Sequence, residues 1–310
     1  MVNWKCRQCD QRSVINMRHH KLALCEEHYI EWFLNQTEKV IIKYRMFTQE
    51  DKILVAISGG KDSLALWDVL NQLGYKTSGI YIDLGIKTQE NYSSKSLQYI
   101  DKFANARNLT LIKYDVVKNI GHSIGEIANQ SKRGLNRECS VCGLIKRHVM
   151  NEIAIQNDFT ILATGHNLDD EVATLFSNTL SWSIALLNRQ SPVLQETNGF
   201  ARKVKPLCRF HERETAAYTL IQGIDYMIDE CPFSKGSKSI HYKHIFNALE
   251  EKQPGIKMKY YIAFLNAQKN GAFPTLDREE IKFNNKCQKC GQPTTAPNLC
   301  AYCRLIESLN

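Results

Sequence analysis

The strongest chemical signal in the sequence is a glycine turn surrounded by polar donors. The apolar run Lys52–Ile57 leads into Ser58-Gly59-Gly60-Lys61-Asp62-Ser63, after which apolar residues recur at helical spacing to Leu73. Glycines allow consecutive backbone N–H groups to converge, and the dipole of the following helix favours negative charge at that point. The two serine hydroxyls and the lysine ammonium add donors. We therefore predict a phosphate-binding loop between a buried strand and a helix.

The loop does not follow the Walker A pattern, because Val55 stands where the first glycine is needed and Asp62 follows the lysine. It resembles instead the PP-loop, S-G-G-x-D-S, of ATP pyrophosphatases. That resemblance implies that the loop holds the β- and γ-phosphates of ATP as a leaving group while AMP passes to a substrate oxygen. An ordinary glycine turn is the alternative, but every specified position matches in a strand–turn–helix context.

Most of the 11 cysteines fall in C-x2-C pairs, and their odd number in a long chain indicates metal sites in a reducing compartment rather than a disulfide framework. One set near each end of the chain has the spacing of zinc ligands. Because protein side chains fill all four positions of each set, we expect two structural zinc ions. The expected ligands are Cys6, Cys9, Cys25 and His28 in the first set, and Cys287, Cys290, Cys300 and Cys303 in the second.

A third group consists of Cys139, Cys142 and the remote Cys231. Three cysteines can hold an iron–sulfur cluster and leave one iron free for a substrate. From spacing alone, a redox dithiol, half of another zinc site and buried structural cysteines remain alternatives. Cys208 has no partner at ligand spacing, so we expect a small buried side chain there.

Strands and helices alternate through the middle of the chain, which predicts an α/β fold with a doubly wound parallel sheet. Such sheets bind ligands at the carboxyl ends of their strands, where three loops should meet: the glycine turn, the end of Tyr81–Asp83, and Thr164-Gly165-His166. The acids of Asp169-Asp170-Glu171 begin the next helix, where they either cap it or act in the site.

The expected strands are Lys52–Ile57, Thr77–Ile82, Thr110–Asp115, Thr160–Ala163 and Lys203–Pro206. The expected helices are Glu26–Phe47, Asp62–Leu73, Gln89–Asn108, Val141–Gln156, Leu168–Thr179, Glu212–Gly223 and Lys257–Asn270, with a surface loop over Ser181–Arg202 and a linker over Pro274–Asn285.

The composition is that of an ordinary globular chain, with 43% hydrophobic residues and a net charge of +8. The positive charge suits a polyanionic partner such as RNA without proving one. No apolar run approaches the roughly 20 residues of a membrane span, and the first residues lack the apolar core of a signal peptide. We therefore expect a cytoplasmic protein without a membrane partner.

The motifs, in their order along the chain, resemble the tRNA 2-thiouridine synthetases of the TtuA type. The set comprises the N-terminal knuckle, the glycine loop, Cys139-Ser-Val-Cys142-Gly, Gly165-His-Asn-Leu-Asp-Asp-Glu171, Glu230-Cys-Pro-Phe-Ser234 and the terminal four-cysteine ribbon. The resemblance covers nearly the whole chain. It implies an N-terminal zinc finger over residues 1–30, a PP-loop ATP pyrophosphatase core over residues 31–270, and a C-terminal zinc ribbon over residues 271–310.

The resemblance also implies roles for single residues. Cys139, Cys142 and Cys231 match the ligands of a [4Fe-4S] cluster, and Lys146 and Asp170 match catalytic residues. The positions expected to meet ATP with its Mg²⁺ are Ala56, Ser58, Gly59, Gly60, Lys61, Asp62, Ser63, Ile82 and Gly165.

The reaction that the resemblance implies begins when O2 of a tRNA uridine attacks the α-phosphate of ATP and pyrophosphate leaves. Sulfur from the open cluster then replaces the adenylated oxygen at C2, and AMP leaves with 2-thiouridine formed. The sulfur donor would be a ubiquitin-like carrier protein with a C-terminal thiocarboxylate, or free sulfide, and the enzyme would be a homodimer. Asp170 either positions Mg²⁺ or accepts a proton, and the sequence leaves open whether the wobble or the T-loop uridine is modified.

Other functions compete with this one. A 2-thiocytidine synthetase also combines a PP-loop with three cysteines, but enzymes of that group generally lack flanking zinc modules. Lysidine synthesis needs no cysteine triad. A non-catalytic RNA-binding protein with zinc modules is the remaining alternative, against which the intact loop residues Ser58, Lys61 and Asp62 argue.

Overall fold

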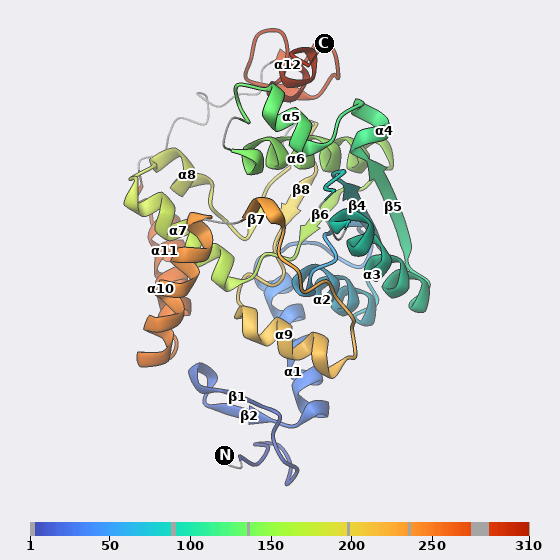
Figure 1. Cartoon of the computed structure of the whole chain (residues 1–310). Coiled ribbons are helices and arrows are strands. Elements are labelled where there is room, and N and C mark those ends of the chain that lie inside the picture. The colour runs from blue at the N-terminus through green and yellow to red at the C-terminus, as the bar shows by residue number, and fades with distance from the viewer. Residues whose placement is uncertain are drawn as a thin grey trace.

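The computed structural model describes residues 4–87, 91–134, 137–196, 199–234, 237–273 and 285–309. Its centre is a six-stranded sheet in the order β5-β4-β3-β6-β8-β7, with helices on both faces (Figure 1). All neighbouring strands are parallel except the edge strand β7, which runs antiparallel to β8. The expected α/β fold with a mainly parallel sheet is thereby confirmed. The strands are β3 (Ile53–Ile57), β4 (Thr77–Asp83), β5 (Thr110–Asp115), β6 (Ile161–Thr164), β7 (Val193–Leu194) and β8 (Arg202–Val204).

Alternate side chains of the central strands pack into two separate hydrophobic clusters. In β3, Ile53 and Val55 belong to one cluster and Leu54 belongs to the other, as the two-residue period of a strand requires. The helices that contribute to the first cluster are α1 (Glu26–Lys43), α2 (Lys61–Gln72), α3 (Tyr92–Ala106), α7 (Leu168–Leu180), α8 (Ile184–Arg189), α9 (Glu212–Ile221), α10 (Lys238–Lys252) and α11 (Ile256–Lys269). Those of the second are α4 (Val116–Ile120), α5 (Ile124–Gln130), α6 (Glu138–Gln156) and α12 (Ala301–Glu307).

A glycine in β4 lets α2 approach the sheet closely. A Cβ atom on Gly79 would lie 2.5 to 2.9 Å from ring atoms of Trp67, which is fully buried. The indole Nε1 also donates to the Thr77 hydroxyl over 3.1 Å. This contact seats α2 against β4 and so fixes the helix whose first turn follows the glycine loop.

The stretch between β5 and α6 differs from the expectation, because it holds two helices. Asp115 caps α4 by accepting from the backbone N–H of Lys118 over 2.9 Å. Ser123 and Glu126 form a capping box at the start of α5. The next helix, α6, begins at Glu138 rather than near Val141, so Cys139 and Cys142 both lie in its first turns.

Two further expectations were wrong. The loop expected over Ser181–Arg202 contains α8 and β7, and β7 extends the sheet past β8. No helix was expected over Lys238–Lys252, where the structure has α10. Most of the linker expected over Pro274–Asn285 lies outside the described residues.

The two terminal modules lie at opposite ends of the molecule (Figure 1). The N-terminal module is a hairpin of β1 (Ile15–Met17) and β2 (Leu22–Leu24) with the short helix η1 (Arg18–His20) at its turn. The C-terminal module pairs β9 (Asn285–Lys286) with β10 (Pro293–Thr294), and α12 packs on α6 through Tyr302 stacked on His148, with ring centroids 3.7 Å apart.

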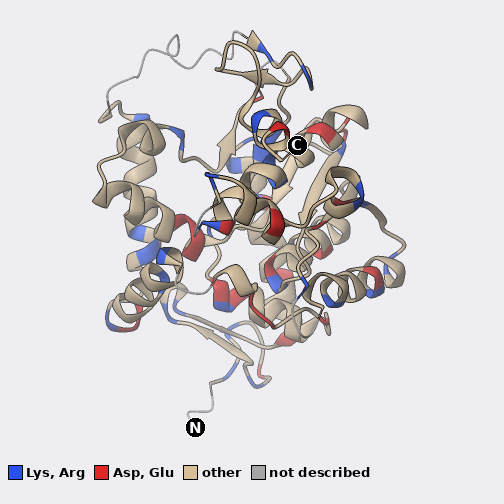
Figure 2. Cartoon of the chain, turned by 45° about the horizontal axis from the view of Figure 1, so that its top comes forward, with Lys and Arg blue, Asp and Glu red and all other residues tan. Residues whose placement is uncertain are grey.

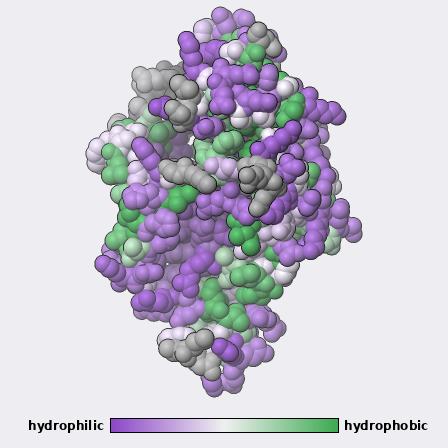
Figure 3. Space-filling view, in the orientation of Figure 1, coloured by the Kyte–Doolittle hydropathy of each residue, from purple (hydrophilic) through white to green (hydrophobic). Residues whose placement is uncertain are grey.

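The surface is mostly hydrophilic on the face shown in Figure 3, with smaller hydrophobic areas between polar ones. None of the helices in the described part of the chain combines the length and hydropathy that a membrane span requires.

Candidate active site

The glycine loop is held in its turn by hydrogen bonds from both sides. Gly59 adopts a φ of +84°, and a Cβ there would lie 2.5 Å from the Ser96 hydroxyl oxygen, so the position requires glycine. Ser96 donates to the carbonyl of Ser58 over 2.7 Å. Inside the loop, the Ser63 hydroxyl donates to the Gly60 carbonyl over 2.9 Å and accepts from the backbone N–H of Ser58 over 3.2 Å. These hydrogen bonds within the protein therefore define the shape of the loop.

Two lysines and three acids form a connected network beside the loop. Lys61 Nζ lies 3.0 Å from Asp62 Oδ2 and 2.6 Å from Glu212 Oε1. Glu212 also lies 3.1 Å from Lys243 Nζ, which in turn contacts Asp170 Oδ1 at 2.6 Å. Burial opposes its ionisation, but Lys243 and Lys61 lower the pKa of Glu212 to about 2. Burial acts to lower the pKa values of Lys61 and Lys243, but the neighbouring carboxylates raise both values above the ordinary one. Glu212 and the two lysines therefore stay charged at neutral pH.

The acids of this network are positioned by neutral neighbours. Asn167 donates to Asp62 Oδ1 over 3.1 Å, and the Thr215 hydroxyl donates to the same oxygen. Burial raises the pKa of Asp62 against the opposing effect of Lys61. Asn167 and Asp170 form the capping box of α7, with both bonds at 3.1 Å. The carboxylates therefore have fixed directions, which a binding site for a cation or a reacting oxygen requires.

A second shared carboxylate joins the starts of α7, α9 and α11. Asp169 accepts from the backbone N–H of Glu212 over 2.9 Å and from Lys257 Nζ over 2.5 Å. Lys257 is only 2% exposed, so this pair is internal. It holds the first turn of α9, and with it Glu212, against the carboxyl end of the sheet.

The backbone positions expected to meet ATP lie along one edge of the sheet. Ala56 is in β3, Ile82 is in β4 and Gly165 follows β6, and these three strands are adjacent and parallel. A Cβ on Gly165 would lie 2.8 to 2.9 Å from backbone atoms of Asp62 and Ser63. Two of the three expected loops are thus in direct contact.

The three cysteines of the third group come together from distant parts of the chain. Cys139 and Cys142 lie at the start of α6, and the short helix η2 (Pro232–Ser234) packs there directly after Cys231. The Cys139 thiol donates to the Phe233 carbonyl over 3.2 Å. Burial raises the pKa values of Cys139 and Cys142, as does the negative charge of the neighbouring thiols. A bound metal centre would relieve this shared cost of thiolate charge.

Lys146 is one helical turn beyond Cys142 on α6. Its ammonium lowers the pKa of Cys142 against the larger effect of burial, through charge and a hydrogen bond. The lysine therefore faces the cysteine group.

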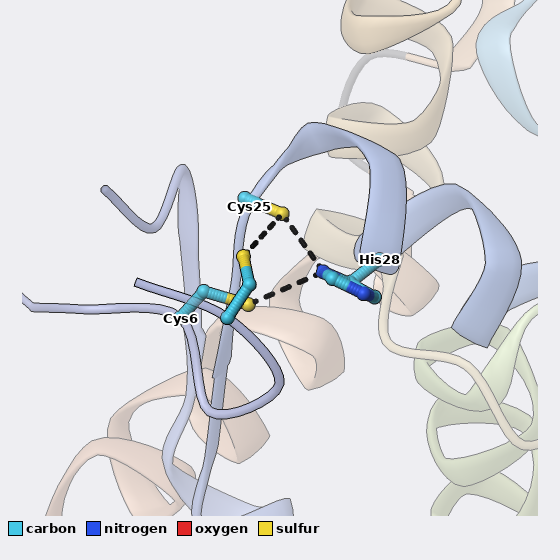
Figure 4. Close-up of side chains that lie close together, drawn as sticks. Cys6, Cys25 and His28 are labelled. Atoms are coloured by element: carbon cyan, nitrogen blue, oxygen red, sulfur yellow. Dashed lines mark hydrogen bonds between the residues drawn. The ribbon is translucent and has the colours of Figure 1, made fainter. Parts of the chain in front are cut away.

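The N-terminal set has the donor chemistry of a structural zinc site. The ligand atoms of Cys6, Cys9, Cys25 and His28 all lie within 4.8 Å of one another. Figure 4 shows Cys6, Cys25 and His28 pointing toward one another, with His28 Nδ1 3.1 Å from Cys25 Sγ. Burial acts to raise the pKa of the Cys6 thiol, but backbone hydrogen bonds to its sulfur lower this pKa to about 6. The set fits zinc, which binds thiolate and imidazole.

The C-terminal set is arranged in the same way. The sulfur atoms of Cys287, Cys290, Cys300 and Cys303 lie within 4.8 Å of one another. The backbone N–H of Cys300 donates to Cys287 Sγ over 3.3 Å. Burial acts to raise the pKa of Cys287, but backbone hydrogen bonds such as this one lower it to about 6. Four converging thiols fit a structural zinc ion.

Sequence reasoning missed Glu212, Lys243, Thr215 and Lys257, which complete the site from its C-terminal side. In the view of Figure 2, basic and acidic residues interleave, so charge alone does not single out the site. One available signal was the acidic first turn of α9, which directly follows its N-cap residue, His211.

Comparison with known protein families identifies the chain. A model described as a PP-loop domain matches residues 29–235, and one described as the N-terminal LIM domain of 2-thiouridine synthetase TtuA matches residues 5–30. A tRNA-5-methyluridine(54) 2-sulfurtransferase of Thermus thermophilus is 44% identical over 304 residues, which cover 98% of this chain and 91% of the relative. The chain belongs to the TtuA-type tRNA 2-thiouridine synthetases. It is therefore a tRNA sulfurtransferase, as the order of its motifs predicted.

A second relative supports the assignment, and one solved structure shares the fold. A tRNA-5-methyluridine(54) 2-sulfurtransferase of Pyrococcus horikoshii is 37% identical, with 97% of this chain and 93% of the relative covered. The solved structure of the U34-tRNA thiolase NcsA from Methanococcus maripaludis, with its [4Fe-4S] cluster, superposes with a TM-score of 0.80 at 24% identity. The match covers 100% of this chain and 98% of the NcsA chain, and the two chains share the same fold.

The close approach of Gly165 to the loop gives a direct prediction. Because the added methyl of Gly165→Ala would press on the backbone at Asp62 and Ser63, it must displace the start of α2. We expect the affinity for ATP, measured by isothermal titration calorimetry, to fall at least ~10-fold, which is about 1.4 kcal/mol.

The matched control is Gly125→Ala in α5, where the added methyl would meet only the Phe233 ring at 3.5 Å. That variant should bind ATP as the unchanged enzyme does. Equal ATP affinity for Gly165→Ala and Gly125→Ala would show that the loop does not depend on this contact.

Proposed function

We propose that this chain replaces O2 of uridine 54 in tRNA, as the 5-methyluridine, with sulfur. The relatives named for this nucleotide are 44%, 37% and 37% identical to it. The thiolase named for uridine 34 is 24% identical. What supports a sulfur-transfer reaction in the structure is the pairing, in one α/β domain, of an ATP loop with a three-cysteine group whose lysine neighbour is Lys146.

ATP binds in this proposal with its β- and γ-phosphates on the Ser58–Ser63 loop. The N–H groups of the loop and the N-terminus of α2 attract the phosphates. Lys61 exchanges Glu212 for phosphate oxygens, and Lys243 remains paired with the displaced carboxylate. Asp62 and Asp170 supply the hard oxygen ligands that Mg²⁺ prefers.

Bound in this way, the α-phosphate can be attacked by O2 of the uridine, with pyrophosphate as the leaving group. Lys61 and the helix N-terminus neutralise the charge that develops on the leaving phosphates. Asp170 is fixed by its capping bond to Asn167 and by Lys243, so its carboxylate has one direction toward the loop. Sulfur then replaces the adenylated oxygen at C2 and AMP leaves.

The cysteine group fits a cluster with one free iron. The other eight cysteines lie elsewhere: seven are in the two zinc sets and Cys208 is fully buried, with a pKa raised by burial to about 12. Cys139 is exposed and Cys142 and Cys231 are half-buried, so a substrate can reach the group. When bound, a [4Fe-4S] cluster on three thiolates supplies an iron without a protein ligand, to which sulfur can bind. Sulfur from a thiocarboxylate carrier protein or free sulfide would enter here.

The first prediction of this proposal concerns Cys231. Protein reconstituted anaerobically, with ATP, sulfide and tRNA, should form 2-thio-5-methyluridine at position 54, as nucleoside mass spectrometry and mapping of the tRNA would show. Cys231→Ala should bind ATP normally but lose the iron of the cluster and the thiolated product, because two thiolates remain.

The control is Cys208→Ala, which removes a thiol outside all three groups. It should keep iron content and product formation. Thiolation by Cys231→Ala at the rate of the Cys208→Ala control would remove the cluster from the reaction, and thiolation at another nucleotide would overturn the assignment of the substrate.

The second prediction separates chemistry from binding at Asp170. Asp170→Asn keeps an oxygen for the capping bond to Asn167 but loses the charge paired with Lys243. We expect single-turnover thiolation to fall by about 10²–10⁴-fold, the usual effect of losing a positioned acid–base group or metal ligand, while the ATP affinity changes less than ~3-fold.

Asp225→Asn makes the same chemical change in an exposed ion pair with Lys102 and should leave the rate unchanged. If Asp170→Asn loses ATP binding in proportion to its rate, Asp170 serves binding alone. A rate equal to that of Asp225→Asn would exclude any role for the carboxylate.

A further inference from the structure

A cavity of about 590 Å³ opens between the N-terminal hairpin and the helices α9, α10 and α11. His19, His211 and Glu250 all line it. Glu212 and Lys243 of the nucleotide site also border it. The cavity therefore connects the N-terminal module to the edge of the active site, away from the two four-ligand zinc sets.

Buried nitrogen atoms without hydrogen bonds face one another at this place. Within the described chain, Nε2 of His19 and Nε2 of His211 have no hydrogen-bond partner although both are shielded from solvent. The His19 side chain is 6% exposed and His211 is 2% exposed. Their ring centroids are 4.1 Å apart. A buried polar atom without a partner costs free energy, so such atoms commonly mark a bound ion or water.

The neighbouring carboxylate of Glu214 does not resolve this deficit. Its Oε1 lies 2.9 Å from His19 Nε2, yet the two atoms do not have the direction of a hydrogen bond, and this oxygen also lacks a partner among the described residues. The other oxygen of Glu214 is used, since it accepts from the backbone N–H of His211 over 2.8 Å. His19 Nε2 is therefore still without a hydrogen bond and can bind a cation.

Three donors are close enough to share one ion. The ligand atoms of His19, His211 and Glu250 all lie within 4.8 Å of one another, and His211 Nε2 is 4.0 Å from Glu250 Oε1. Glu250 is already oriented, because it accepts from the backbone N–H groups of Gly255 over 2.5 Å and Lys257 over 3.1 Å. Two imidazoles and a carboxylate form a donor set that suits Zn²⁺ among the common divalent metals.

We propose that His19, His211 and Glu250 form a third metal site that binds one Zn²⁺ ion, distinct from the two cysteine-containing sets. Three protein ligands leave a coordination position open toward the cavity, unlike the closed cysteine sites. The ion joins the turn of the N-terminal hairpin to the start of α9 and to α10. Because His211 immediately precedes Glu212, the ion also fixes the end of the helix that carries the counter-charge of Lys61.

The test compares the zinc content and the zinc anomalous signal of matched variants. The full-length protein is equilibrated with a molar excess of Zn²⁺, and its zinc content is measured by inductively coupled plasma mass spectrometry. It should contain one more zinc ion per chain than His211→Gln or His19→Gln. Anomalous difference maps from crystals of the unchanged protein, collected at the zinc edge, should show a peak among these three residues.

His244→Gln is the control, because His244 lines the same cavity but is not one of the three donors. It should keep the full zinc content, and added Zn²⁺ should raise the melting temperature of this control but not that of His211→Gln. Equal zinc content in His244→Gln, His19→Gln and His211→Gln, or an anomalous map with peaks only at the cysteine sets, would overturn the proposal. The anomalous map decides the question even if a histidine variant does not fold.

Discussion

The active site depends on how two lysines are held together at the end of a sheet. Lys61 and Lys243 come from opposite halves of the chain and would repel each other in a half-buried site. Glu212 lies between them and is kept ionised by both, with a pKa of about 2, although burial opposes this. With Asp62 and Asp170 the network has three carboxylates for two ammonium groups, so the two lysines can lie close together in a half-buried place.

The need to place Glu212 between the two lysines explains why the chain returns to the sheet after β8, its last parallel strand. The glycine loop and α2 supply Lys61, while α9 and α10 supply Glu212 and Lys243. Asp169 locks α9 in place by accepting from the backbone of Glu212 and from buried Lys257 on α11. The cysteine group is also assembled from distant parts of the chain, since η2 brings Cys231 to the first turns of α6.

The sequence predicted the features that depend on local pattern. The Ser58–Ser63 loop, the alternation of strands and helices, and the two zinc sets are encoded in short spacings, and all of them appear in the structure where the pattern put them. The features it missed depend on tertiary contact. Helix α10 has no clear apolar stripe and is fixed by packing on α7, and Lys243 acquires its role only through Asp170 and Glu212. Helix α8 was hidden in a polar stretch, and β7 is too short to show alternation.

If the tRNA uridine itself attacks ATP, as proposed above, its O2 atom leaves with AMP. A tRNA carrying ¹⁸O at O2 of uridine 54 can be thiolated in a single turnover and the AMP examined by mass spectrometry. We expect AMP that contains one ¹⁸O atom, together with unlabelled pyrophosphate. AMP without the label, or label released to water while thiolation proceeds, would contradict adenylation of the base.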